Sequence, residues 1–480
     1  MLLLAILAVP AVAALLSYVE PTGRWSDWIT VVSMLAALAL SIVAALGAVV
    51  TGEVSGMGGW LVCDGLGALI VVLVAFVGFT SALYSVGYLA HHHSSDRSDM
   101  RAYFSQFNLF MVSLLAVPLM ANVALLWVAL ELTTLLSAFL VGFYGTSEAL
   151  EAAWKYAVLT TLGAIIALLG ILMLYWGTSF LGTEAFTWNE LIAAAPSMPV
   201  SIVWPAFLLI LIGIGTKVGL VPMHTWLPDA HSQAPAPICA VLSGVETTTA
   251  LYVILRLFSV LSRLPESEAR PWFLGFGLVS IAVATLLLLR VRDYKRMFAF
   301  STVEHMGIIL IAVGIGGAEA QFAAAYQIAA HALAKSFCFF AAGLVLLLTG
   351  EQEIAAVRGL ARRAPLAASA LLAGGLAITG MPPSAIFISE LLIFKAGLAR
   401  GLYVVVGFLA LFIIVGFAAI LRHVTHMSFG ALAKKRIGAW AEPTCMMALG
   451  ITAVPLVLLG VYLPAAFEAL LRLAGKAIGP

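Results

Sequence analysis

The segment "GTKVGLVPMHTWLPDAHSQAPAP", residues 215–237, places a lysine, two histidines, an aspartate and four prolines in a chain that is otherwise mostly apolar. Glycines loosen the helix around Lys217, and Pro222 then removes a backbone donor and ends or kinks the helix. Irregular backbone at membrane depth persists only where it is buried in protein or lines an aqueous cavity. The segment therefore predicts a broken membrane helix with a lysine at the break.

The composition is that of an integral membrane protein. Of the 480 residues, 63% are hydrophobic and 10% are charged, and the mean hydropathy is +1.10, whereas a soluble domain carries about 25% charged residues. Apolar runs long enough to cross a hydrocarbon core recur along the chain, and we count about 14 of them. The first run lacks a basic n-region, so we expect a retained helix rather than a cleaved signal peptide.

The basic residues predict the orientation of these spans, because Lys and Arg collect in cytoplasmic loops. Alternate assignment of the loops puts fifteen basic residues on one side and seven on the other. We therefore expect both termini to face away from the cytoplasm, in a bacterial or archaeal cytoplasmic (inner) membrane.

A second break follows the same design as the first. The stretch "GGLAITGMPPSAIF", residues 374–387, interrupts a span just before Glu390. Two broken helices at matching places in successive five-helix blocks are typical of inverted-repeat transporters. The predicted fold is thus all-α with two inverted repeats, spans 4–8 and 9–13. The expected regions are N-terminal helices 1–3 (1–100), a first repeat (101–262), a second repeat (263–430), and a C-terminal loop with helix 14 (431–480).

Ionisable residues inside the spans indicate what the protein carries, since each costs about 2.5–3.5 kcal/mol to insert. Taken alone, any one of them is also explained as a hydrogen-bonding group between helices. Their distribution over six helices favours a line of alternating acids and bases along an ion path. His331 and Lys335, four residues apart, share a helix face, and a water-lined relay and a local packing pair both remain open for them. The set comprises Glu131, Lys217, Glu246, Glu304, His305, His331, Lys335 and Glu390.

The sequence has neither a P-loop nor a GxGxxG motif after a strand, and its four cysteines are scattered in apolar contexts without metal-binding spacing. We therefore expect no cofactor, no metal and no redox catalysis in this chain. A desolvated lysine is a suitable proton carrier, because burial favours its neutral form and a nearby carboxylate favours its charged form. Movement of Glu131 relative to Lys217 would then switch the lysine between holding and releasing a proton.

Several segments carry a resemblance to a known family. The opening segment is similar to the signature of the antiporter-like proton-pumping subunits of respiratory complex I and of their relatives in cation/proton antiporters and membrane-bound hydrogenases. Within that family, "STVEHMGI" and "PPSAIFISE" look most like the F-type subunit of hydrogenase-4 and formate hydrogenlyase complexes. Further matching segments are "VALELTTLLSAFLVG", "AAWKYAVLTTLG", "RDYKRMFAFSTVEHMGII", "HALAKSFCFFAAG" and "GMPPSAIFISELLI".

The resemblance implies roles for particular residues. Glu131 corresponds to the acidic partner in span 5, Lys217 to the lysine of the broken helix, and Glu390 to the terminal site. The resemblance also assigns His331 and Lys335 to the span 11 pair. Residues expected to act in a relay or at an entry are His224, Asp229, His231, Glu246, Thr248, Glu304, His305 and Lys155. For the histidines and the aspartate of the opening segment, capping of helix ends is the alternative.

One position departs from the family pattern. Thr248 stands where many relatives have a lysine in span 8, and Glu246 is expected on another helix face. Two interpretations follow: either waters bridge the two half-channels through residues 247–249, or pumping is reduced or absent.

The predicted function is a proton-translocating, antiporter-like membrane subunit of a redox-driven complex, with sodium as the other candidate ion. The resemblance implies hydrogenase-like large and small subunits, iron–sulfur proteins and a smaller membrane anchor as partners, and no nucleic acid. The alternatives are a subunit of a multisubunit Na+/H+ antiporter without a redox enzyme, and the membrane subunit of an inorganic-carbon uptake system with a soluble zinc protein. A nonconducting member of the family is a further alternative, against which the set of membrane charges argues.

Overall fold

The computed structural model describes residues 1–20, 23, 25–92, 97–182, 186–263, 269–430 and 442–479. In these residues, 13 helices are long and apolar enough to cross a membrane, and the shorter apolar helix α16 completes a further broken span with α17. The expectation of a polytopic, all-α membrane protein is confirmed. Four basic residues of the expected cytoplasmic loops, Arg24, Lys434, Lys435 and Arg436, lie outside the described residues.

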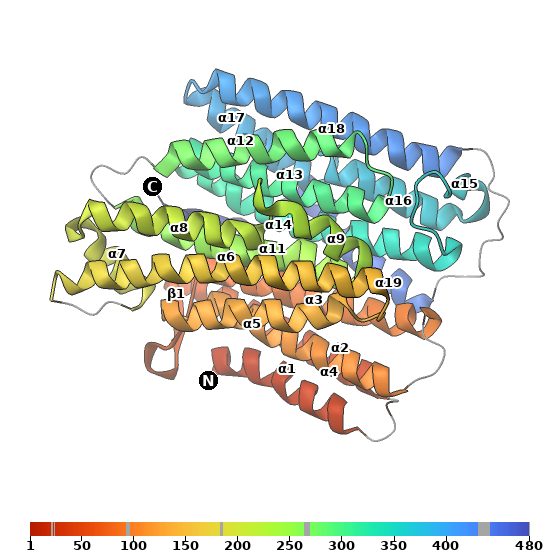
Figure 1. Ribbon diagram of the computed structural model, residues 1–480, viewed down its shortest axis with the longest axis horizontal. Coiled ribbons are helices and arrows are strands. Elements are labelled where there is room, and N and C mark those ends of the chain that lie inside the picture. Colours follow the sequence, from red (N-terminus) through yellow and green to blue (C-terminus); the bar gives the residue numbers. More distant parts are fainter. Residues whose placement is uncertain are drawn as a thin grey trace.

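The N-terminal helices pack beside a small hairpin (Figure 1). Strands β1 and β2 are antiparallel, with Glu53 opposite Asp64. The sequence analysis did not predict this hairpin, whose strands have four residues each. The elements are α1 (Leu2–Val19), α2 (Ser26–Thr51), β1 (Glu53–Gly56), a 3-10 turn (Met57–Gly59), β2 (Leu61–Asp64), α3 (Gly65–His92) and α4 (Arg97–Ala116).

The next helices carry the first break. Asn122 caps α5 by accepting from the backbone N–H groups of Ala124 and Leu125, which satisfies donors that a helix start leaves free. The elements are a 3-10 turn (Val117–Leu119), α5 (Val123–Val141), α6 (Ser147–Ser179), α7 (Trp188–Ala194), a 3-10 turn (Ala195–Ser197), α8 (Val200–Val218), η4 (Met223–Thr225), α9 (Trp226–Gln233), α10 (Ala236–Val241), the π-helix η5 (Leu242–Glu246) and α11 (Thr247–Leu261).

The remaining helices carry the second break, between α16 and α17. Each break contains a glycine in the left-handed region, Gly219 in the first (φ 84°) and Gly380 in the second (φ 73°), where other residues are strained. The elements are α12 (Ala269–Leu288), α13 (Tyr294–Ile315), α14 (Ala318–Thr349), α15 (Leu360–Arg363), α16 (Pro365–Ile378), α17 (Ala385–Ala399), α18 (Tyr403–Phe429), α19 (Pro443–Val461) and α20 (Ala465–Ile478).

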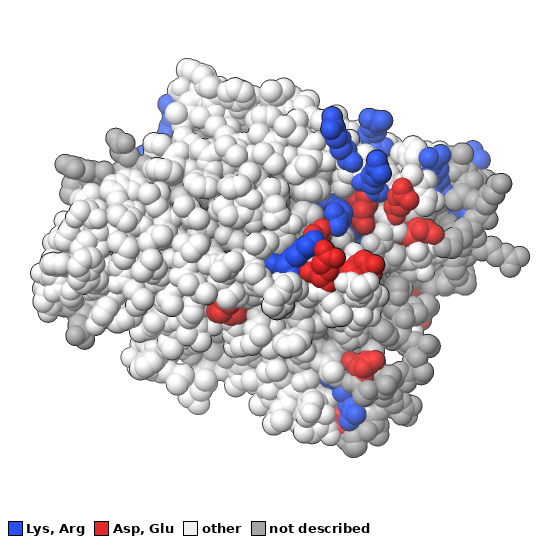
Figure 2. Space-filling model, in the orientation of Figure 1, with Lys and Arg blue, Asp and Glu red and all other residues white. Residues whose placement is uncertain are grey.

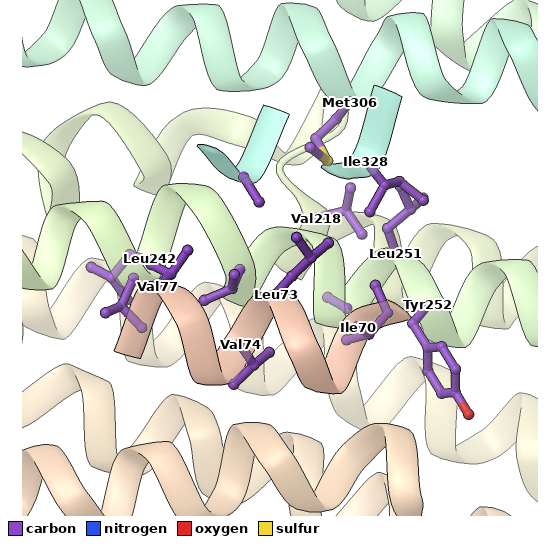
Figure 3. Close-up of a cluster of buried hydrophobic side chains, with 14 of the residues drawn as sticks. Ile70, Leu73, Val74, Val77, Val218, Leu242, Leu251, Tyr252, Met306 and Ile328 are labelled. Atoms are coloured by element: carbon purple, nitrogen blue, oxygen red, sulfur yellow. The ribbon is translucent and has the colours of Figure 1, made fainter. Parts of the chain in front are cut away.

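Helix α3 lies in the centre of the core. Its residues Ile70, Leu73, Val74 and Val77 lie among side chains from α8, η5, α11, α13 and α14 (Figure 3). The terminal helix α20, which the sequence analysis did not predict, buries one face that includes Leu471 against this core. Of the elements that bear the membrane charges, η5 with Glu246 and α14 with Lys335 pack directly against α3.

The two ends of the bundle differ in charge. Both termini lie at one end, together with the hairpin β1–β2 (Figure 1), and we call this end the termini face. On the side shown in Figure 2, Lys and Arg gather toward the opposite end.

Helices α6 and α8 cross at a pair of glycines. A Cβ atom added to Gly213 would lie 2.6 Å from the backbone nitrogen of Ala167 and closer still to the carbonyl oxygen of Gly163. These neighbours are backbone atoms, which cannot turn away as a flexible side chain would. The crossing therefore fixes the distance between α6 and the helix that carries Lys217.

We predict that Gly213→Ala lowers the free energy of unfolding by about 1–3 kcal/mol, as overpacking typically does. The measurement is the thermal midpoint of the purified protein in mild detergent. Gly450→Ala in α19 is the matched control, because a Cβ there meets no atom within 4 Å. A midpoint for Gly213→Ala equal to that of the control would contradict the tight crossing.

Candidate functional site

The first break is closed by hydrogen bonds rather than left open. The N–H groups of Gly219 and Leu220 both donate to the carbonyl of Gly215. Trp226 of α9 donates from Nε1 to the carbonyl oxygen of Thr216, at 2.7 Å. Since the freed backbone groups have partners inside the protein, this irregular segment is stable at membrane depth, as the sequence predicted.

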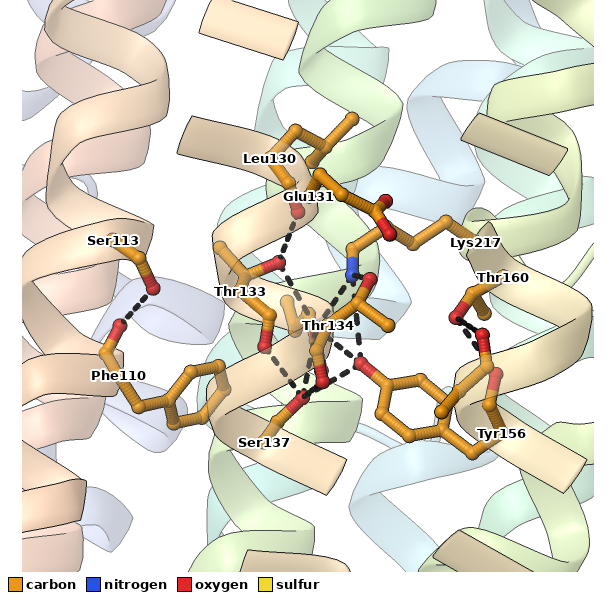
Figure 4. A network of polar contacts seen from close by, with 12 residues as sticks. Phe110, Ser113, Leu130, Glu131, Thr133, Thr134, Ser137, Tyr156, Thr160 and Lys217 are labelled. Carbon is orange, nitrogen blue, oxygen red and sulfur yellow. Dashed lines mark hydrogen bonds and ion pairs between the residues drawn. The ribbon is translucent and has the colours of Figure 1, made fainter. Parts of the chain in front are cut away.

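Lys217 lies one residue before the end of α8 and is buried, with a side-chain exposure of 2%. Its Nζ lies 3.0 Å from Oε1 of Glu246, whose side chain is 1% exposed. The ammonium also contacts the hydroxyls of Thr134 at 2.5 Å and Tyr156 at 3.4 Å (Figure 4). A charged pair this deeply buried requires such additional hydrogen bonds to offset desolvation.

The carboxylate of Glu246 has partners of its own. Its Oε1 accepts from Tyr156 at 2.7 Å, from Thr133 at 3.2 Å and from Ser137 at 3.4 Å. The ion pair is thus surrounded by hydroxyls from α5 and α6 (Figure 4). Each hydroxyl can both donate and accept, so the cluster can accommodate either protonation state of the pair.

The role expected of Glu131, as an acidic group that moves relative to Lys217, stays a prediction. Glu131 lies beside the lysine side chain in Figure 4, but its Oε1 accepts from Thr161 at 2.5 Å, and its Oε2 has no hydrogen-bond partner. The carboxylate that contacts the Lys217 ammonium is that of Glu246.

Glu246 is the last residue of the π-helix η5, and its side chain reaches Lys217 of α8. Thr248, at the family lysine position, instead donates to the carbonyl of Gly244 within its own helix.

A second buried cluster surrounds Lys335 of α14. The Lys335 ammonium donates to the carbonyl of Phe298 at 2.5 Å and contacts the hydroxyl of Ser301, both on α13. His331, on the same face of α14, has Nε2 3.1 Å from the carbonyl oxygen of Ser243. Because Ser243 belongs to η5, the π-helix contacts both clusters: Ser243 the second and Glu246 the first.

His305 and two uncharged polar residues, Gln327 and Ser389, extend the second cluster toward the second break. His305 has Nδ1 2.9 Å from Nε2 of Gln327 and Nε2 2.8 Å from the carbonyl oxygen of Ile378, the last residue of α16. Ser389 of α17 donates to Gln327. The rings of His305 and His331 are 5.4 Å apart. The sequence analysis missed Gln327 and Ser389, because uncharged polar residues are common at helix contacts.

The two remaining carboxylates occupy separate positions. Glu304 lies against Gly416 of α18, on a different side of α13 from His305, because adjacent helical residues point in different directions. Glu390 is buried on α17, and its carboxylate lies where a Cβ of Gly380 would be. Glycine at the second break therefore makes room for Glu390.

The expected entry residues separate into two groups. Asp229 of α9 forms ion pairs with Lys155 of α6 at 3.3 Å and with Arg296 of α13 at 2.5 Å. We call these three partly exposed residues the surface group. His231 is fully buried, and its Nδ1 lies 2.7 Å from the carbonyl oxygen of Leu227, one turn earlier in α9. His224 is partly exposed, and its Nδ1 has no hydrogen-bond partner.

No group of three or more His, Cys, Asp or Glu side chains is placed to hold a metal ion within the described residues. The four cysteines are buried as free thiols.

The model of the NADH:quinone oxidoreductase/Mrp antiporter membrane family matches residues 120–417. The chain belongs to this family. It is an antiporter-like, proton-translocating membrane subunit, and its partners are other membrane subunits. The matched residues include both helix breaks, both lysine clusters and Glu390.

Relatives of several kinds are similar to this chain. The hydrogenase-4 component F homolog of Methylacidiphilum infernorum is 40% identical over 78% of this chain and 80% of its own length. NADH-quinone oxidoreductase subunit N of Desulforudis audaxviator is 30% identical over 73% of this chain and 68% of its own. A Na(+)/H(+) antiporter subunit of Alkalihalophilus pseudofirmus is 30% identical over 69% of this chain, but over 42% of its own length.

Solved structures share the fold. A chain of the archaeal membrane-bound sulfane sulfur reductase superposes with a TM-score of 0.88 at 24% identity, covering 99% of this chain and 98% of its own. A chain of the Mrp complex from Dietzia sp. superposes with a TM-score of 0.86 at 20% identity, covering 99% and 96%.

We predict that Glu246→Gln lowers the free energy of unfolding by about 3 kcal/mol, because it leaves a buried ammonium without its counter-charge. Thermal unfolding in detergent measures the loss. Glu131→Gln is the matched control and is expected to lose less than about 1.5 kcal/mol, since it alters a hydrogen bond rather than the ion pair. Equal losses in the two variants would contradict the assignment of Glu246 as the partner of Lys217.

Proposed function

We propose that this chain conducts protons for a redox-driven complex of the hydrogenase-4 or formate hydrogenlyase type. The 40% identity to a hydrogenase-4 component F homolog over most of both chains supports this choice among the members of the family. In this proposal the electron-transfer chemistry belongs to hydrogenase-like and iron–sulfur partner subunits. The present chain contributes the buried, hydrogen-bonded charges that move protons.

The observation that carries the proposal is the buried pair of Lys217 and Glu246 at a helix break. While the pair is closed, the carboxylate stabilises the ammonium. Separation of the two side chains leaves the ammonium unpaired in a low-dielectric site, at a cost of several kcal/mol, and this cost drives release of its proton. The break between α8 and α9 supplies the element that can move, because few helical hydrogen bonds cross it.

The π-helix η5 is the proposed link between the two clusters. Ser243 contacts His331 through its carbonyl and Thr302 through its hydroxyl, at 2.6 Å. Displacement of Glu246 at one end of η5 would therefore shift a partner of His331 at the other. In this proposal Thr248 does not take over the role of the lysine that many relatives have at this position. The two clusters are coupled through the backbone of η5 instead.

The remaining expected residues have places in this proposal. The two halves, residues 101–262 and 263–430, would act as successive half-channels with Lys217 and Lys335 at their centres. Glu390 would be the terminal site, and Glu131, with one oxygen unpartnered, an acidic relay on the side of α5. The surface group of Lys155, Asp229 and Arg296 would lie at an entry with His224.

We further propose the cytoplasmic membrane of a prokaryote, with both termini outside the cytoplasm. The gathering of Lys and Arg at the end opposite the termini face supports this orientation, by the tendency of basic residues to remain cytoplasmic (Figure 2).

A sodium/proton antiporter role is the second candidate, favoured by the 30% identity to an antiporter subunit of Alkalihalophilus pseudofirmus. Purification of the tagged chain from its native membrane, with mass spectrometry and metal analysis of the copurifying proteins, distinguishes the candidates. Nickel, iron and hydrogenase-like chains support the redox complex. Small hydrophobic partners alone support the antiporter, and a soluble zinc protein supports a role in inorganic-carbon uptake.

We predict that Lys217→Met and Glu390→Gln each assemble with their partners but lose most coupled proton movement, to a tenth or less of the parent rate. Assembly is expected because Glu246 keeps its hydroxyl partners when Lys217 is replaced. The measurement is proton uptake by vesicles that contain the complex.

Lys395→Met is the matched control for these two variants, because this lysine lies on the same helix as Glu390 but is 67% exposed. The Lys395→Met variant should translocate protons at the parent rate. Parent rates in assembled Lys217→Met or Glu390→Gln would refute the relay.

A further inference from the structure

A small cavity lies near the termini face, away from both lysine clusters. Its volume is about 30 Å³, and one water needs about 10–15 Å³ by the same measure. The hairpin, α7 and α11 contribute its walls, and the lining residues include Glu53, Asp64, Trp188, Tyr252 and Arg256. Three charged side chains around so small a space make it a polar site.

The charges of the cavity are fixed in position. Arg256 of α11 donates from both terminal nitrogens to Asp64, at 2.5 and 2.6 Å, in a bidentate pair. Asp64 also accepts from the backbone N–H of Gly67 at the start of α3. Burial raises the pKa of Asp64, but the Arg256 guanidinium outweighs burial and lowers it below its usual value. The pair is thus an ionised contact between α11 and the end of β2, one residue before α3 begins.

Polar atoms without protein partners follow one face of α11 from this cavity to the ion pair. They are Oε2 of Glu246, Oγ1 of Thr249 and Nε of Arg256, and all three atoms are buried. Spacings of three and seven residues put these positions on one side of a helix. Buried polar atoms in native proteins are almost always hydrogen-bonded, and water is the partner where protein supplies none.

We infer that this face of α11 is the water-lined path by which protons pass between Glu246 and the termini face, with the cavity at Asp64 and Arg256 as its mouth. The inference rests on the proposed function and adds to it a route for the first half-channel. The path is about 15 Å long, from the rise of ten helical residues. Val253 lies on the same face and is its one apolar member, so the water column narrows there.

The Asp64–Arg256 pair closes the mouth. While the guanidinium binds both oxygens of Asp64, the carboxylate has little capacity left for a hydrated proton. Opening of the pair exposes an acceptor to the termini face. Because Asp64 immediately precedes α3 and Arg256 belongs to α11, a small relative movement of these two helices opens or closes the path.

The first test measures access of water, independently of transport. Cysteine is introduced at Thr249 or Val253, in the full-length chain with its four native cysteines replaced by alanine. Membrane vesicles are treated from each side with the small charged reagent methanethiosulfonate ethylammonium. Leu251→Cys and Leu255→Cys are matched controls, because these residues are equally buried on the opposite side of α11.

We expect Thr249→Cys and Val253→Cys to react at least ten times faster than the controls, and only from the termini face. Equal rates on the two sides of α11, or reaction only from the opposite face of the membrane, overturn the path. Because labelling needs no turnover, this result stands even if Lys217→Met is found to pump normally.

The second test measures use of the path. Thr249→Val keeps the side-chain shape but removes the hydroxyl, and we expect proton translocation by the intact complex to fall about tenfold, the effect of losing roughly one hydrogen bond. Thr249→Ser restores the hydroxyl and should keep at least half of the parent rate. A parent rate in assembled Thr249→Val overturns the role of this face in conduction.

Discussion

The structure depends on keeping one ammonium and one carboxylate paired in the buried interior. Lys217 and Glu246 come from helices on either side of a break, and leaving either charge there without the other costs several kcal/mol. Three departures from regular helix serve the pair: the break after Val218, the left-handed Gly219, and the π-helix that ends at Glu246. Each lowers local helical stability, and each is held by surrounding packing.

Close packing supplies that support. The glycine crossing of α6 and α8 sets the position of Lys217 relative to the hydroxyl groups of α5 and α6. Trp226 fixes the other side of the break through its bond to Thr216. A site in which one proton changes the energy by several kcal/mol needs rigid surroundings, because loose packing would admit water and weaken the electrostatic interaction.

The membrane class, both breaks and most of the buried charges could be predicted, because each has a local signal in the sequence. The signals are long apolar runs, glycines close to prolines within those runs, and ionisable residues within those runs. The sequence did not indicate that Glu246 contacts Lys217. The sequence pattern does not show which neighbouring helix the side chain of Glu246 faces, and in the structure it contacts Lys217 of α8. The hairpin and α20 also escaped prediction, because short strands and a partly polar terminal helix resemble loops. Gln327 and Ser389 lack any charge that would mark them.

The central position of α3 has a consequence for biogenesis. This helix inserts early, yet Gly65 at its start packs against Leu473 of α20, and its middle is buried by helices made much later. At 5–20 residues per second, roughly 20–80 s separate the synthesis of the two segments. During that interval α3 is surrounded by lipid or by the insertion machinery rather than by its final neighbours. The native packing of α3 is therefore complete only after α20 has been synthesised.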